Sequence, residues 1–588
     1  MKEKSGNYQP DIHNRDYERE YLQIKMEASS LINTAGRETE SLNGKWNFAE
    51  DLYDTCRRAH WYKEARYNTS GGEMPLDYDW EGWSKITVPA VWNLEKPELH
   101  YFEGSGIYTR TFRYFPKTHG ERLLLRFEGA AYRTSVFLNG QFIGTHDGAS
   151  TPFNIDISDT VKTDNRIVAV TDARRSPERI PMENTDWFNY GGIYRDVFLV
   201  RVPQVFIKDW FVRLGAFSTI LADVEIAGSL NGKAFLEIPE LEIKQEIIIK
   251  NGKGEVKIPA KPDLWSPENP KLYEIIISFN SDTVRDKTGF RVIETKGQEI
   301  FLNGKKIFLK GICVHEDHFL LGKTTNEEII RNTIRDLKEM NGMYLRLAHY
   351  PHDGRFARIA DEEGVLLWEE VPVYWAAAFD SEDTYRDAEN QLSELILRDR
   401  NRASVIIWSV GNENADSDSR LNFMSRLAQK AKSLDDSRLV SAACLVNHEK
   451  LLIEDRLSDF LDVIGINEYY GWYDPDFEKL PKILDNSNPG KPVLVCEFGG
   501  DARAGQRGTI DDLWTEDKQK RLYEQQIETF KKCPYIAGLT PWILYDFRCP
   551  RRLNRYQEKF NRKGLIGADR KTKKEAFYVM QKFYHEGE

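Results

Sequence analysis

The stretch SVIIWSVGNE, residues 404–413, and a second one, PVLVCEFGG at residues 492–500, decide the fold of this chain. Each is a run of apolar and β-branched residues that leads to a glutamate, Glu413 in the first stretch and Glu497 in the second. Continuous apolar runs of this length are typical of parallel strands that are buried on both faces. A carboxylate at the end of such a strand indicates a reactive group at the carboxyl-terminal mouth of a parallel sheet.

Around these two stretches, residues 290–588 alternate apolar runs with amphipathic helical segments. The eight runs are KIFLKGICV (306–314), MYLRLAH (343–349), GVLLWEEVP (364–372), SVIIWSVGNE, RLVSAACL (438–445), DVIGINEYY (462–470), PVLVCEFGG and AGLTPWILYDF (537–547). Eight strands alternating with helices over roughly 250 to 300 residues predict a (β/α)8 TIM barrel. A doubly wound open sheet is the alternative, which fits less well because polar residues end nearly every run instead of gathering at one switch point.

Two helix boundaries in this region are also predicted from local signals. Thr325 and Glu328 have the spacing of a capping box at the start of the first helical segment. Gly364 stands where a left-handed glycine would end the second segment.

The first half of the chain is predicted to form two β-sandwich domains. Short alternating runs separated by turn residues indicate an antiparallel, jelly-roll-like sandwich over residues 1–203, with Asn139-Gly140 as its clearest hairpin turn. Residues 204–289 continue the alternation over the length of one immunoglobulin-like module. We expect that module to be a spacer without chemistry of its own.

Charge and composition exclude several classes of partner. The 588-residue chain has a formal net charge of -11 and no long block of one sign, so we expect no nucleic acid partner. The N-terminal segment MKEKSGNYQPDIHNRDYERE is polar, and no apolar run approaches the roughly 18 residues of a membrane span. The six scattered cysteines indicate reduced thiols. We therefore expect a cytoplasmic protein that does not contact the membrane. We also expect a homo-oligomer.

The residues that end the eight runs are rich in carboxylates and aromatic rings. They lack the His and Cys groupings of a structural zinc site, and we expect neither a metal nor a cofactor. In a barrel all of these residues converge on one face. Glu413 and Glu497, on the fourth and seventh runs, could lie about 5 to 5.5 Å apart, the separation that a retaining glycoside hydrolase needs.

These motifs resemble those of glycoside hydrolase family 2. WSVGNE is similar to the acid/base signature of the family and EFGG to its nucleophile signature. The resemblance extends over nearly the whole chain, with a sugar-binding-like sandwich, an immunoglobulin-like module and a catalytic barrel in that order. It implies an enzyme that acts on a carbohydrate substrate and makes a non-catalytic carbohydrate-binding protein an alternative that would require a lost glutamate.

The resemblance also implies roles for individual residues. Glu413 would be the general acid/base and Glu497 the nucleophile, while Asn412 would bind the sugar 2-hydroxyl and Tyr469 would steady the nucleophile. Trp542 resembles the aromatic floor under the sugar. The full predicted substrate-binding set is Asp186, His315, Arg346, His349, Asn412, Asn467, Tyr469, Tyr473, Trp542, Arg548, Gln557, Asn561 and Lys563.

Other polar residues at the strand ends have a structural alternative. Glu369, Glu370 and Glu468 match no role in the family and are interpreted as wall or salt-bridge residues. His315 has two open interpretations, a sugar ligand or a core histidine whose hydrogen bonds are satisfied within the protein.

The sugar is predicted from a segment near the C-terminus. Asn561 and Lys563 resemble the Asn-x-Lys pair with which β-glucuronidases of this family bind the substrate carboxylate. The chain departs from that pattern at Gln557, where those enzymes have an arginine that contacts the sugar. We therefore expect an exo-acting, retaining β-uronidase, either a β-glucuronidase or a β-galacturonidase. A neutral β-galactosidase of the same family is the alternative.

Overall fold

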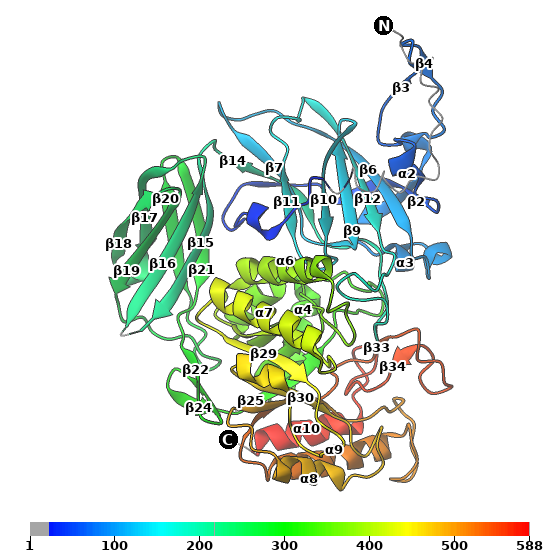
Figure 1. Cartoon of the computed structure of the whole chain (residues 1–588), viewed down its shortest axis with the longest axis vertical. Helices are drawn as coiled ribbons and strands as arrows, with labels where there is room; N and C mark the ends of the chain where they lie inside the picture. The colour runs from blue at the N-terminus through cyan, green and yellow to red at the C-terminus, as the bar shows by residue number, and fades with distance from the viewer. Residues whose placement is uncertain (1–20, 22, 217, 587–588) are drawn as a thin grey trace.

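The computed structural model describes residues 21, 23–216 and 218–586. The polar N-terminal segment that contributed to the expectation of a cytoplasmic protein, residues 1–20, lies outside the described residues. Three regions follow one another along the chain, two antiparallel β-sandwiches and a closed parallel barrel surrounded by helices (Figure 1). This is the predicted fold, and it is confirmed.

The first sandwich packs a six-stranded sheet, in the order β10-β9-β12-β6-β2-β5, against a four-stranded sheet, β1-β14-β7-β11. Its hairpin at Asn139-Gly140 is confirmed, since Leu138 pairs with Gln141 and both turn residues have positive φ. Its strands are β1 (Thr39–Ser41), β2 (Gly44–Asp51), β3 (Arg66–Tyr67), β4 (Glu73–Met74), β5 (Ser84–Val88), β6 (Ser105–Arg113), β7 (Arg122–Phe127), β8 (Ala130–Ala131), β9 (Arg133–Leu138), β10 (Gln141–Asp147), β11 (Phe153–Asp156), β12 (Asp164–Asp172), β13 (Gly192–Ile193) and β14 (Val197–Val202), and its short helices are η1 (Ala28–Ser30), α2 (Thr55–Arg58), η2 (Trp80–Gly82), α3 (Trp92–Glu95) and η3 (Pro97–Leu99).

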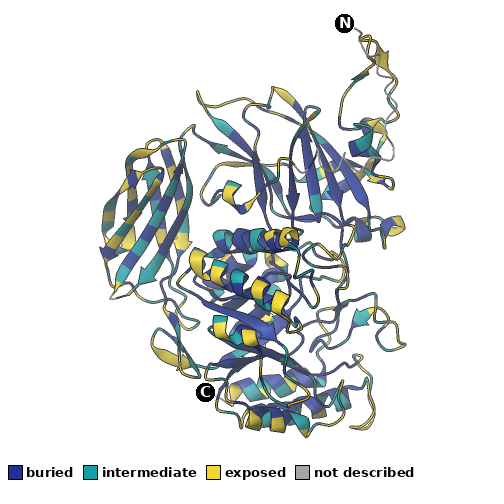
Figure 2. Cartoon of the chain, viewed as in Figure 1, coloured by how far each residue is buried: buried dark blue, intermediate teal, exposed yellow. Residues whose placement is uncertain are grey.

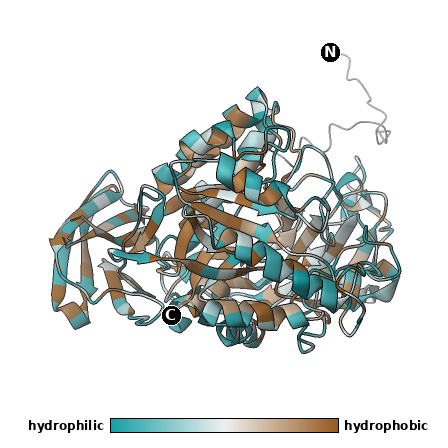
Figure 3. Ribbon diagram, turned by 90° about the horizontal axis from the view of Figure 1, so that it is seen from below, coloured by the Kyte–Doolittle hydropathy of each residue, from teal (hydrophilic) through white to brown (hydrophobic). Residues whose placement is uncertain are grey.

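The second sandwich is the immunoglobulin-like module, with seven strands in the order β15-β16-β19-β18-β17-β20-β21. Along β16 buried and partly exposed residues alternate, the period of a strand with one face on a core. In Figure 3, where this module lies at the left, hydrophilic and hydrophobic residues are interspersed along its strands. Its elements are β15 (Phe206–Gly215), β16 (Thr219–Ala227), β17 (Asn231–Ile238), η4 (Pro239–Leu241), β18 (Ile243–Lys250), β19 (Lys253–Pro259), β20 (Tyr273–Phe279) and β21 (Asp282–Thr288).

The barrel begins after a small three-stranded sheet of β22 (Ile293–Lys296), β23 (Glu299–Leu302) and β24 (Lys305–Ile307). All eight predicted runs form strands of one closed parallel barrel, and Figure 2 shows them as its buried interior. The barrel strands are β25 (Leu309–Val314), β26 (Tyr344–Leu347), β27 (Leu366–Glu370), β28 (Val405–Asn412), β29 (Leu439–Cys444), β30 (Ile464–Glu468), β31 (Val493–Phe498) and β32 (Ile536–Leu539).

Amphipathic helices cover the barrel and turn exposed faces outward (Figure 2). In the first of them, Ile330, Ile334 and Leu337 are buried at helical spacing. The helices are α4 (Glu327–Glu339), α5 (Gly354–Glu363), α6 (Glu382–Asp399), α7 (Asp418–Leu434), η5 (Arg456–Phe460), α8 (Lys479–Asn486), α9 (Glu516–Phe530) and α10 (Glu575–His585), and a hairpin of β33 (Phe547–Arg548) and β34 (Phe560–Asn561) follows β32.

One predicted helix boundary is wrong and the other is confirmed. The N-cap of α4 is Asn326, whose side chain accepts a hydrogen bond from the Ile329 amide, so the capping box expected from Thr325 and Glu328 does not form. Asparagine is as good an N-cap as threonine, and the register of the helix moves by one residue. Gly364 is the left-handed C-cap of α5, with φ 69°.

Buried polar pairs join the three regions. Between the first sandwich and the barrel, His146 contacts Glu394 at 3.0 Å and Arg195 contacts Glu316 at 2.8 Å. Asn401 joins the barrel to the immunoglobulin-like module, accepting from the Val212 amide at 3.0 Å. Because a buried charge is costly without its partner, the pair of Arg195 and Glu316 stabilises the packing of the first sandwich against the loop that follows β25. None of the described helices is long and apolar enough to cross a membrane.

Candidate active site

Glu413 and Glu497 lie at the carboxyl-terminal mouth of the barrel. Glu413 directly follows β28 in the left-handed region, with φ 53°, and its amide donates to the carbonyl of Ala443 at 2.8 Å. Glu497 is part of β31 and is buried. Burial, together with the charge of Glu413, raises the pKa of Glu497. The two carboxylates therefore influence each other within one site.

Three side chains surround the Glu497 carboxylate. Arg346 donates to Oε1 at 2.8 Å, and the hydroxyl of Tyr469 donates to Oε2 at 2.7 Å. Nε2 of His349 is 3.7 Å from Oε1. These three contacts oppose the rise in the pKa of Glu497 that burial causes, and so favour the ionised form that a nucleophile requires.

Arg346 is completely buried and connects several groups of the site. It donates to Oδ1 of Asn412 at 2.6 Å and forms an ion pair of 3.1 Å with Glu370. Burial alone would raise the pKa of Glu370, but the charge of Arg346 and a hydrogen bond with His349 outweigh it, and the pKa falls to about 2. Glu370 is thus a salt-bridge residue, as interpreted from the sequence.

The other two glutamates at the strand ends have few partners. Burial, with the nearby charge of Asp399, raises the pKa of Glu369 well above its usual value. Burial and the charge of Glu413 raise the pKa of Glu468 to about 8. These shifts favour the protonated form of both carboxyls, and both side chains form part of the wall of the site.

Two donors position the carboxylate of Glu413. The indole Nε1 of Trp375 donates to Oε2 at 2.8 Å, and the amide of Asn467 donates to Oε1 at 3.0 Å. Asn412 lies beside them, and its buried Nδ2 has no hydrogen-bond partner among the described residues. A buried amide that lacks a partner is costly unless a ligand supplies one, which makes Asn412 a donor available to a sugar hydroxyl.

An aromatic wall closes one side of the site. Trp542 stacks on the ring of His349 at 4.8 Å and meets His315 edge-on at 5.1 Å. Trp187, from the first sandwich, packs against His349 at 5.7 Å and Tyr374 at 4.9 Å. Flat apolar surfaces of this kind suit the apolar face of a sugar ring.

His315 combines features of both interpretations that the sequence left open. Its Nδ1 lies 3.1 Å from the hydroxyl of Tyr350, as in a core histidine. Its Nε2 is buried and has no partner in the part of the chain that the structure describes. Burial, with the nearby His349, lowers its pKa well below the usual value, so the ring is neutral.

The first sandwich contributes Asp186 to the barrel mouth. Arg552 forms an ion pair of 2.6 Å with Oδ2 of Asp186 and donates to Oδ1 at 3.2 Å. Asn561 also donates to Oδ2, at 3.3 Å. The carboxylate that the resemblance places at the sugar hydroxyls is thus held by one residue of the loop that follows β33 and by one residue of β34.

Lys563 follows β34, two residues beyond Asn561. Its ammonium is buried, forms an ion pair of 2.9 Å with Asp501, and donates to the hydroxyl of Tyr473 at 2.7 Å. Gln557 donates to the other oxygen of Asp501, at 2.9 Å. The ammonium also lies 5.5 Å from the centre of the Tyr469 ring, which connects this cluster to Glu497.

Arg548 contacts other residues than those around Glu497 and Lys563. Its guanidinium pairs with Asp317 at 3.3 Å and donates to the backbone carbonyls of His318 and Phe319. The structure therefore brings twelve of the thirteen predicted substrate-binding residues into one connected cluster around the two glutamates, and it directs Arg548 toward the loop after β25.

Sequence reasoning missed four residues of the cluster, Trp187, Trp375, Asp501 and Arg552. Trp187 and Trp375 had a weak signal, since Trp187 directly follows the predicted site residue Asp186 and Trp375 lies three residues after the third run. Asp501 and Arg552 lie on loops, where periodicity gives no information on direction.

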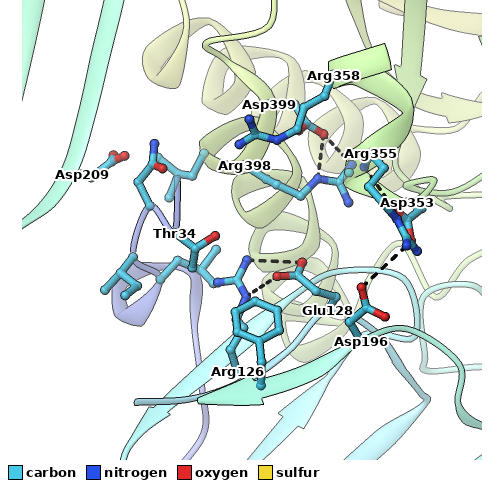
Figure 4. Close-up of a pocket in the computed structure, with 16 residues that line it drawn as sticks. Thr34, Arg126, Glu128, Asp196, Asp209, Asp353, Arg355, Arg358, Arg398 and Asp399 are labelled. Atoms are coloured by element: carbon cyan, nitrogen blue, oxygen red, sulfur yellow. Dashed lines mark hydrogen bonds and ion pairs between the residues drawn. The ribbon is translucent and has the colours of Figure 1, made fainter. Parts of the chain in front are cut away.

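A separate cavity of about 200 Å³ lies where the three regions meet (Figure 4). Its charged side chains are largely paired with one another, as in Arg126 with Glu128 at 2.9 Å and Arg355 with Asp353 at 2.7 Å. No predicted site residue lines it. We assign this cavity no chemistry. Among the described residues, no group of His, Cys, Asp and Glu could hold a metal ion.

Comparison with protein families gives a match over each of the three regions. The model of the glycosyl hydrolases family 2 TIM barrel domain matches residues 293–586, half of the chain. The sugar binding domain of the same family matches residues 39–203, and a further family 2 model matches residues 206–291.

Curated relatives and solved structures agree with these matches. The chain is 27% identical to a β-glucuronidase of Paenibacillus borealis, over 94% of this chain and 98% of that one. It is 26% identical to a β-glucuronidase of Bacteroides fragilis, over 98% of this chain and 86% of that one. A β-glucuronidase of Ruminococcus gnavus in complex with D-glucuronic acid superposes with a TM-score of 0.82 and 25% identity, over 95% of this chain and all of that one.

Proposed function

The chain belongs to glycoside hydrolase family 2, and from that premise we propose that it is an exo-acting, retaining β-uronidase, in the first place a β-glucuronidase. The observation that carries the proposal is the buried ammonium of Lys563, which lies beside Tyr469 and therefore one aromatic ring away from Glu497. A cation at that distance suits a sugar that carries a carboxylate. The relatives named as β-glucuronidases support this substrate class.

In the first step, the Glu497 carboxylate attacks C1 of the sugar while the bond from C1 to the leaving oxygen breaks. Glu413 transfers its proton to that oxygen, and the product is a glycosyl ester of Glu497. The contacts of Arg346 and Tyr469 favour the ionised form of Glu497, which makes this attack.

In the second step, Glu413 takes a proton from water, the water oxygen bonds to C1, and the ester bond to Glu497 breaks. Inversion occurs twice, so the sugar keeps its β configuration. The hydrogen bonds from Trp375 and Asn467 to Glu413 hold its carboxylate in place between the two steps.

Gln557 supports galacturonide as a second substrate. Its amide turns to Asp501 and is buried, so no long cationic side chain extends from this position toward the sugar. The axial C4 hydroxyl of a galacturonide would therefore have the space that an arginine at position 557 would fill. The neutral β-galactosidase alternative would leave Lys563 without a substrate partner.

A comparison of nitrophenyl substrates tests the proposal. We expect turnover of the β-glucuronide, and of the β-galacturonide at a comparable rate, with little turnover of the β-galactoside. Glu497→Gln should abolish all three activities while the protein remains folded. Turnover of the galactoside alone would refute the uronidase assignment, and full activity of Glu497→Gln would refute the mechanism.

We further propose that the protein acts in the cytoplasm as a homo-oligomer. The scattered, mostly buried free cysteines support a reducing compartment. Cell fractionation and light scattering of the purified protein test the two statements separately.

A further inference from the structure

We propose that Arg552 is a specificity-determining residue that binds the carboxylate of the substrate together with Lys563. The inference rests on the proposed function, since it names the group that lets the site prefer an acidic sugar over a neutral one. In this proposal, Arg552 supplies the positive charge that the neutral Gln557 does not.

The two cations converge on one neutral oxygen. The hydroxyl of Tyr473 accepts from Nζ of Lys563 at 2.7 Å and from Nη1 of Arg552 at 3.2 Å. The two nitrogens are thus no farther apart than those two distances together, a gap that the two oxygens of a carboxylate can span. A hydroxyl is a weaker acceptor for two charged donors than a carboxylate is.

Lys563 alone is a poor anion site because its charge is already neutralised. Asp501 is fully buried and lies 2.9 Å from the ammonium. Gln557 supplies Asp501 with a hydrogen bond but with no charge. A substrate carboxylate bound only by Lys563 would therefore share one cation with a second anion, which is unfavourable in a buried site.

Arg552 is the more accessible of the two cations. Its side chain is 22% exposed, whereas that of Lys563 is 2% exposed. Of its five N–H groups, the hydrogen bonds to Asp186 and Tyr473 use three. At least one N–H of each cation has no partner among the residues that the structure describes, and both can serve a ligand.

The charged side chains around Tyr473 and Asp186 carry one more positive charge than negative charges. Lys563, Arg552 and Arg551 are the cations, and Arg551 lies 3.8 Å from Asp186. Asp186 and Asp501 are the carboxylates that these three contact. Three positive and two negative side chains would be balanced by a sugar that carries a single carboxylate.

Arg552 also links the acidic end of the sugar to its hydroxyls. Its planar fork holds both oxygens of Asp186, the residue that the first sandwich sends into the site. A substitution here could therefore act through Asp186 on every sugar, and the test must separate that general effect from a selective one.

The test compares Arg552→Gln and Arg552→Lys with the wild-type enzyme on two substrates that differ only at C6, nitrophenyl β-glucuronide and its methyl ester. We expect Arg552→Gln to lower kcat/KM for the glucuronide roughly ten- to a hundred-fold, mainly through KM, as for the loss of a charged hydrogen bond. The ester should change far less. Arg552→Lys keeps the charge and should recover much of the preference for the acid.

Arg555→Gln is the matched control, because Arg555 belongs to the same loop, is exposed, and contacts Tyr556 rather than the cluster. It should behave as the wild type on both substrates. If the ester proves too slow to measure, the inhibition constants of D-glucuronate and D-glucose replace the two rates.

Equal losses on acid and ester would overturn the inference, because Arg552 would then act only by positioning Asp186. An unchanged preference for the acid in Arg552→Gln would overturn it as well. Failure of the proposed function has a different signature, since the wild-type enzyme itself would then hydrolyse no uronide.

Discussion

Arg346 donates a hydrogen bond of 2.8 Å to Glu497 from a position with no exposed surface. The same guanidinium is the ion-pair partner of Glu370. One buried cation therefore compensates two carboxylates, and both the stability of the barrel and the ionisation of the nucleophile depend on it.

Replacing Arg346 by glutamine should affect stability and pH dependence together. Two buried carboxylates would lose their cation, at a cost of about 3 to 5 kcal/mol in the free energy of unfolding. The pKa of Glu497 would rise, so the acidic limb of the kcat/KM profile should move to higher pH. Denaturant unfolding and a pH–rate profile measure the two effects. Arg355→Gln, which removes a partly exposed cation from Asp353, should leave the profile unchanged.

Replacing Glu370 by glutamine should flatten the acid dependence of stability. In the folded protein the pKa of Glu370 is lowered from 4.5 to about 2, so its stabilisation is complete above pH 4.5 and is lost as the pH falls toward 2. At about 1.36 kcal/mol for each pKa unit, the loss amounts to about 3 kcal/mol. The thermal unfolding midpoints of the wild-type protein and Glu370→Gln, measured below pH 4.5, check this prediction. Midpoints that fall in parallel with pH in the two proteins would contradict it.

Replacing Glu468 by glutamine should act in the opposite pH range. The pKa of Glu468 is raised from 4.5 to about 8, so the wild-type protein loses stability as the pH rises from 4.5 through 8. Glutamine keeps the shape and removes the titration, and should be the more stable form near pH 8, by at most about 5 kcal/mol. Thermal midpoints across this range are the measurement. A stability difference that does not change with pH would show that Glu468 ionises normally.

Replacing Trp375 by phenylalanine should weaken acid catalysis. The variant loses the 2.8 Å hydrogen bond from the indole to Glu413 and keeps most of the ring. We expect a reduction in kcat/KM of about tenfold or more, greatest for leaving groups of high pKa, which most need a proton from Glu413. A series of aryl and alkyl glucuronides measures it. Trp472→Phe, in a tryptophan that packs on Trp514 instead, is the control. A loss independent of the leaving group would contradict a role through Glu413.

Much of the fold could be predicted from the sequence because the barrel strands are buried on both faces. Each of the eight apolar runs became a strand, and the runs that end at Glu413 and Glu497 deliver both carboxylates to one mouth. Only the first part of the eighth run forms a strand. Strand β32 ends at Leu539, and Trp542 reaches the site from the loop that follows β32.

The parts that could not be predicted depend on loops. Arg548 and Arg552 are four residues apart in one arginine-rich segment, yet one pairs with Asp317 and the other with Asp186. Composition cannot distinguish them, since the direction of each side chain is set by carboxylates that are distant in the sequence. The same holds for Asp501, whose role is visible only once Lys563 and Gln557 are placed around it.

Asp186 reaches the barrel mouth from a domain that holds neither of the two glutamates, and it meets Arg552 on a loop outside the eight strands. The two glutamates lie at the ends of barrel strands, whereas Asp186 and Arg552 lie on loops, one in the first sandwich and one after β33. Substitutions in these two loops could therefore alter the preferred sugar during evolution while the two glutamates and their reaction stay the same.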